Sequence, residues 1–122
     1  MSATFQRIRL ELARTPEYPE GNPEHGYVFL APLNSEAHID AEAWSKWKAR
    51  CRVWRFAGAD TEIGMLRHVG RGWRFDYKSN SSDDDEPLFK LDRHALTPGS
   101  YVSITEHDGV QRAFKVVSVT PA

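Results

Sequence analysis

The sequence contains a single cysteine, Cys51, and no long hydrophobic run. A lone cysteine cannot form an internal disulfide, which agrees with a reducing compartment, and it does not by itself make a metal site. The absence of a stretch of about 18 apolar residues argues against a spanning helix. Residues 1–11 alternate charged and apolar side chains, whereas a signal peptide needs a continuous apolar segment. We therefore expect a cytoplasmic protein.

The sequence also lacks the motifs of common catalytic sites. It has no Gly-x-Ser-x-Gly and no Gly-Lys-Ser/Thr, and Gly70-Arg71-Gly72 lacks the third glycine of a dinucleotide-binding loop. The acidic run Asp83–Glu86 lacks the glycine and the later glutamate of a calcium loop. The five histidines are scattered singly, without metal-ligand spacing. No catalytic residue, metal site or cofactor is predicted, and the interpretation leans against an enzyme.

What the chain does contain is enough for one folded domain. Its 122 residues include 40% hydrophobic residues, so a single domain over residues 1–122 is expected. Residues 79–87 have no apolar side chain before Pro87 and predict an exposed, flexible acidic loop. Residues 15–23 hold three prolines and a glycine, which predicts a second surface loop.

Alternation of apolar and polar residues predicts mostly strands. In Phe5–Leu12, Ile8, Leu10 and Leu12 lie on one face and arginines on the other. Similar runs cover residues 26–33, 51–57, 63–69, 73–77, 101–104 and 110–119. Residues 88–91 are a further, short candidate strand. The glycine-rich connection Gly70-Arg71-Gly72 and the Asp-Gly pair of His107-Asp108-Gly109 favour hairpins. We predict a mainly β (α+β) fold, a small antiparallel barrel or sandwich of about seven strands with one helix.

The helix is predicted at about residues 40–50. Asp40 is suited to cap its first turn, and Trp44, Trp47 and Cys51 follow at the spacing of one apolar stripe. Cys51 is therefore expected to be buried rather than reactive. In the strand that follows, we predict that Trp54 points into the core and that the arginines form the opposite, solvated face.

The C-terminal stretch His94–Ile104, followed by Phe114–Val119, resembles a family of small uncharacterised bacterial proteins. The likeness runs through most of the chain. It implies alternating strands after a Pro-Gly turn and carries no activity with it.

Charge is unevenly distributed along the chain. Residues 1–45, 46–74 and 75–122 carry partial charges of −4, +6 and −3, within a net charge of −1. Such a positive centre indicates an anionic partner or attraction between parts of the domain. The candidate nucleic-acid-binding cations, which lie among aromatic residues, are Lys46, Lys48, Arg50, Arg52, Arg55, Arg67, Arg71 and Arg74.

Three functions remain open from the sequence. The first is a non-enzymatic binding domain acting through protein association, or self-association across an exposed strand edge, since tryptophan and tyrosine are abundant. The second is single-stranded nucleic-acid binding through the basic, aromatic centre. The third is a small-molecule binder or enzyme with a pocket at the barrel mouth, lined by Tyr27, Trp73 or Tyr101. No membrane partner is expected.

Overall fold

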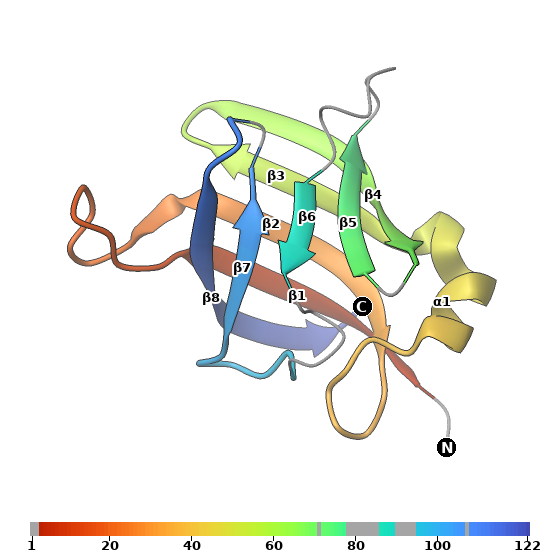
Figure 1. Cartoon of the computed structure of the whole chain (residues 1–122). Helices are drawn as coiled ribbons and strands as arrows, with labels where there is room; N and C mark the ends of the chain where they lie inside the picture. The colour runs from red at the N-terminus through yellow and green to blue at the C-terminus, as the bar shows by residue number, and fades with distance from the viewer. Residues whose placement is uncertain (1–2, 71, 78–85, 90–94, 107) are drawn as a thin grey trace.

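The chain forms a closed antiparallel β-barrel with one helix (Figure 1). The structure is a computed structural model that describes residues 3–70, 72–77, 86–89, 95–106 and 108–122. Within these residues the strands are β1 (Thr4–Leu12), β2 (Asn22–Leu33), β3 (Arg52–Ala57), β4 (Asp60–Val69), β5 (Gly72–Tyr77), β6 (Glu86–Phe89), β7 (Tyr101–Thr105) and β8 (Gln111–Pro121). The helix α1 (Ala41–Trp47) continues into a 3₁₀ turn, η1 (Lys48–Arg50). The predicted mainly β fold with one helix is confirmed.

Each strand pairs with its neighbours in sequence, and β8 returns to pair with β1. Every strand in the described part of the chain therefore has a partner on both sides. The described strands thus lack the unpaired edge through which self-association was predicted, because closing a barrel removes its edges, while self-association itself stays a prediction. None of the described helices is long and apolar enough to cross a membrane.

The interior of the barrel is filled with side chains. Tyr27, Phe29, Phe75 and Phe114 are fully buried. The Tyr27 ring centroid lies 5.2 Å from that of Phe75 and 5.1 Å from that of Phe114. An eight-stranded barrel is just wide enough for its side chains to fill or to hold one small ligand. In this barrel, aromatic rings occupy the centre.

The helix α1 lies at one end of the strands, opposite the β1–β2 and β3–β4 connections (Figure 1). It begins where the sequence predicts, because the Asp40 carboxylate accepts a hydrogen bond from the Ala43 amide at 3.0 Å. The Trp44 indole packs edge-on against Trp73 and donates to the Leu66 carbonyl at 3.0 Å. Cys51 is buried, as predicted. We call the other end of the barrel the mouth.

The structure corrects the predicted orientation of β3. Val53 is fully buried and Trp54 is only half-buried, so Val53 and Arg55 point into the barrel while Arg52 and Trp54 point outward. Val53 opposes Phe29 and Arg55 opposes Tyr27, two buried residues of β2. A period of two fixes which residues share a face but not which face is inside, and a shift of one residue exchanges the faces.

Two strands begin inside predicted loops. Strand β2 begins at Asn22, inside the predicted proline-rich loop, and Pro23 is accommodated at its end. Strand β6 begins at Glu86, where Glu86 and Pro87 oppose Phe75 and Arg74. The last two residues of the predicted acidic loop therefore belong to a strand. Residues 79–85 of that loop lie outside the described residues.

Candidate functional site

A shallow groove crosses the outer face of β1, β2 and β3. Its volume is about 290 Å³, and its lining consists of Phe5, Arg7, Leu30, Ala49, Arg50, Arg52, Trp54 and Ala122. Three arginines and two aromatic rings contribute to it, and no acidic side chain does. We refer to it as the basic groove.

Strand pairing brings the basic groove together from distant parts of the sequence. Arg7 points outward because its neighbour Ile8 points into the core, and it opposes Leu30 of β2. On β3, Arg52 and Trp54 share the outward face. The turn η1 adds Arg50, whose guanidinium carbon lies 4.7 Å from the centroid of the Phe5 ring.

The cations of the basic groove differ from other arginines of the barrel in how their charge is balanced. Within the described residues, Arg7 and Arg52 make no hydrogen bond or ion pair, and the recorded interaction of Arg50 is its contact with Phe5. By contrast, Arg9 pairs with Glu11 at 2.8 Å. The groove therefore presents exposed positive charge that the described part of the protein leaves unpaired.

The sequence-predicted cations separate in the structure. Arg50 and Arg52 lie in the basic groove, and Lys46 and Lys48 are exposed on α1 and η1. Arg67 and Arg74 oppose each other on β4 and β5, where Arg67 forms an ion pair with Asp76 at 2.6 Å. Arg71 lies outside the described residues.

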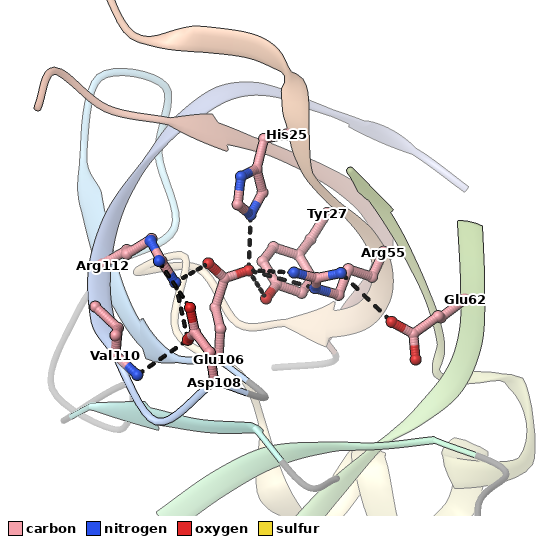
Figure 2. Close-up of polar contacts among 8 residues, drawn as sticks. All are labelled: His25, Tyr27, Arg55, Glu62, Glu106, Asp108, Val110 and Arg112. Atoms are coloured by element: carbon pink, nitrogen blue, oxygen red, sulfur yellow. Dashed lines mark hydrogen bonds and ion pairs between the residues drawn. The ribbon is translucent and has the colours of Figure 1, made fainter. Parts of the chain in front are cut away.

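Arg55, the remaining predicted cation, points into the mouth of the barrel (Figure 2). Only 14% of its side chain is exposed, and its Nη2 lies 3.0 Å from the Glu106 carboxylate. Its Nη1 also lies 3.4 Å from Glu62. The guanidinium of Arg55 is thus part of an internal charge network rather than of the outer surface.

Glu106 is the centre of this network (Figure 2), and its side chain is 1% exposed. Its Oε2 accepts hydrogen bonds from the Tyr27 hydroxyl and from Arg55, and lies 2.8 Å from the His25 Nε2. Its Oε1 accepts from Arg112 Nη1 at 2.9 Å. We call His25, Tyr27, Arg55, Glu106 and Arg112 the mouth cluster.

Burial of the Glu106 carboxylate would by itself raise its pKa. Hydrogen bonds from His25 and Tyr27 and the charges of His25 and Arg55 outweigh this effect and lower the pKa from 4.5 to about 2. At the surface next to the cluster, hydrogen bonds from Arg112 and from the Val110 amide lower the pKa of Asp108 to about 2. Glu106 is therefore ionised throughout the neutral and mildly acidic range.

This pKa predicts a loss of stability in acid. A carboxyl group whose pKa is depressed by folding stabilises the native state above its unfolded pKa, here about 4.5, and the contribution is lost as the pH falls through about 2. The shift corresponds to on the order of 3 kcal/mol. Urea unfolding followed between about pH 6 and pH 2.5 should show a smaller pH dependence for Glu106→Gln than for the wild type. Equal pH dependence in both proteins would contradict this assignment.

The predicted pocket residues Tyr27, Trp73 and Tyr101 are not neighbours. Tyr27 is buried in the mouth cluster, and Trp73 is buried beside α1. Tyr101 is 54% exposed and lines a groove of about 440 Å³ outside the barrel, between the β1–β2 connection and β8. A separate cleft of about 410 Å³ lies at the mouth, and His25 and Arg112 are among its lining residues.

Comparisons with family models, curated proteins and solved structures found no match.

Other chemistry is limited in the described part of the chain. Burial raises the pKa of the Cys51 thiol to about 11, despite the opposing charge of Arg50, so the thiol is neutral near pH 7. No group of three histidine, cysteine or carboxylate side chains is arranged there to hold a metal ion. Residues 83–85 of the acidic run lie outside that part.

Sequence reasoning missed Arg7, Glu106 and Arg112. Glu106 continues the alternation of the buried residues Val102 and Ile104. This period of two predicts that its charged side chain faces inward. Arg112 likewise precedes Phe114 and Val116 on the inward face of β8. Arg7 gave no comparable signal, because its proximity to Arg50 and Arg52 depends on the pairing of three strands.

Proposed function

We propose that this protein binds single-stranded nucleic acid in the basic groove. The observation that carries the proposal is the presence of three arginines, without a counter-charge among the described residues, beside the half-buried Trp54. Proteins that bind single strands combine cations that follow the phosphates with aromatic rings on which bases stack. Both components occur within this one groove.

The outward-facing, half-buried indole of Trp54 favours a single strand over a duplex. Bases in a duplex are already stacked on their neighbours, whereas an unpaired base can be stacked on a protein ring. Trp54 points outward in the middle of the β2–β3–β4 face, opposite Val28 and Ile63, and Ile63 is 49% exposed. This apolar surface next to Arg52 suits a base placed beside a phosphate.

The net charge of −1 is compatible with an anionic ligand. In about 0.1 M salt, charges separated by more than about 10 Å are largely screened. The local field of Arg7, Arg50 and Arg52 therefore governs the approach of a phosphate more than the total charge does.

Titration of labelled single-stranded DNA and RNA oligonucleotides at several salt concentrations tests the proposal. We expect affinity to fall as salt rises, with a log–log slope of about −2 if three phosphates are neutralised on a single strand. Trp54→Ala is expected to reduce affinity by about 1–3 kcal/mol without changing this slope. Absence of binding at low salt would overturn the proposal.

An acidic peptide of matched length serves as the competing ligand. If it binds as tightly as the oligonucleotides and Trp54→Ala has no effect, the groove recognises an acidic protein segment instead. That result would favour the protein-association hypothesis, which stays a prediction.

A further inference from the structure

The mouth of the barrel has a second cleft that the basic groove does not involve. Its volume is about 410 Å³, and it lies between the β1–β2 connection and the start of β8. The lining residues are Leu12, Thr15, Glu17, Tyr18, His25, Val110, Gln111, Arg112 and Ala113. Two of them, His25 and Arg112, also contact the buried Glu106. The mouth cluster therefore reaches the wall of a cleft of ligand size.

The Glu106 carboxylate fixes the orientation of His25. His25 Nε2 lies 2.8 Å from Glu106 Oε2, and the edge of the imidazole packs against Phe114 with ring centroids 5.6 Å apart. A carboxylate only accepts hydrogen bonds, so in the neutral imidazole the proton resides on Nε2 and Nδ1 is an acceptor. In the described part of the chain, Nδ1 has no hydrogen-bond partner, while 19% of the side chain is exposed.

Arg112 adds donors to the same wall. Its Nη1 donates to Glu106 and Asp108, and its Nη2 donates to Asp108 at 2.8 Å. A guanidinium has five N–H groups, so these three bonds leave two for another acceptor. Its positive charge, however, is already matched by two carboxylates.

The charge balance points to an uncharged ligand. An anion would meet Glu17 and would find the charge of Arg112 already matched by Glu106 and Asp108, whereas a cation would meet the Arg112 guanidinium. The ligand also has to remain at the mouth, because the rings of Tyr27, Phe75 and Phe114 fill the interior behind it. A molecule with a hydroxyl or amide N–H next to a carbonyl or ether oxygen would pair with both His25 and Arg112.

We propose that the mouth cleft binds a small uncharged polar molecule when the His25 imidazole is neutral: His25 Nδ1 accepts one hydrogen bond from this molecule and Arg112 donates another to it. The buried Glu106 acts as the positioning residue that holds both side chains in place. A buried carboxylate is costly unless all its hydrogen bonds are made. A network in which they are made keeps its side chains in one arrangement.

The test is an NMR screen, observed on protein labelled with ¹⁵N-histidine, of uncharged fragments that carry hydroxyl, amide or carbonyl groups, alongside their carboxylate and ammonium analogues. We expect several uncharged fragments to bind and to shift the His25 imidazole nitrogen resonances, and the charged analogues to bind at least tenfold more weakly. If no uncharged fragment shifts His25, or if charged analogues bind equally well, the proposal is overturned.

His25→Gln provides a variant that keeps the fold. The glutamine amide nitrogen can still donate to Glu106, as Nε2 does, but the rigid ring that places the Nδ1 acceptor is lost, and the remaining acceptor is the oxygen of a flexible side chain. We expect unfolding close to that of the wild type and at least a tenfold loss of fragment affinity, whereas His38→Gln, on the β2–α1 connection, should bind normally. Unchanged affinity in His25→Gln would contradict the assigned role.

The tautomer of His25 can be measured without any ligand. Long-range ¹H–¹⁵N spectra at mildly alkaline pH, where an ordinary histidine is neutral, should show the proton on Nε2. A proton on Nδ1 would remove the acceptor and overturn the proposal. Since this measurement and the fragment screen do not involve the basic groove, their outcome is independent of nucleic-acid binding.

Discussion

Replacing Glu106 by leucine is expected to lower the free energy of unfolding by about 3–5 kcal/mol. The change would remove the Glu106 acceptor of the buried Tyr27 hydroxyl and leave Arg55 beside a more distant carboxylate, that of Glu62 at 3.4 Å. Removing one partner of a buried ion pair is costly because the remaining charge stays out of water. For a chain of this size, the midpoint of thermal unfolding should fall by on the order of 10–20 °C.

Asp108→Asn is the matched control for this variant. It also removes one carboxylate that contacts Arg112, but 54% of the Asp108 side chain is exposed, and asparagine keeps an acceptor for the Val110 amide. Exposed ion pairs contribute at most about 1 kcal/mol. If the two variants are destabilised by the same amount, burial of the Glu106 network does not have the importance assigned to it.

A double variant separates the orphaned charge from the other contacts. Arg55→Met combined with Glu106→Leu removes both members of the Arg55–Glu106 ion pair. Replacing a buried ion pair by apolar residues often changes the free energy of unfolding little. We therefore expect the double variant to be more stable than Glu106→Leu alone. Strict additivity of the two substitutions would show that the pair is not coupled.

The strands were predictable because their signals are local. Ile8, Leu10 and Leu12 alternate with polar residues, and Asp108-Gly109 favours the observed hairpin, in which Gly109 has φ = 80°. The same holds for the helix, since Asp40 caps it from within the same stretch of chain. Closure of the barrel through β1 and β8 joins opposite ends of the sequence and leaves no local pattern.

The orientation of β3 could not be derived from its own residues. Either Val53 and Arg55 or Trp54 and Phe56 could have faced inward, and the size of the indole favoured the wrong choice. In the folded barrel Glu106, which directly follows β7, supplies a buried partner for the inward-facing Arg55. An inward arginine is tolerated only where such a partner exists. The residues around Arg55 in the sequence do not indicate that Glu106 is its partner.

Double substitution Arg7→Ala/Arg52→Ala is expected to weaken binding of a single-stranded oligonucleotide by about 100-fold in low salt. Each lost phosphate contact should also reduce the salt dependence by about 0.7 in log–log slope, hence by about 1.4 for the pair. Both side chains are exposed and make no hydrogen bond or ion pair with described residues, so the fold should remain stable. Arg50 is retained, because it packs on the Phe5 ring.

Arg14→Ala/Lys115→Ala removes the same number of positive charges from a different surface. Both residues line the groove beside Tyr101 rather than the basic groove. If binding depended only on net charge, the two double variants would lose affinity equally. We expect the Arg14/Lys115 variant to bind within about threefold of the wild type, since exposed charges separated by more than about 10 Å are largely screened at about 0.1 M salt. Equal losses in the two variants, with equal changes in salt slope, would mean that the arginines of the basic groove do not form a specific site.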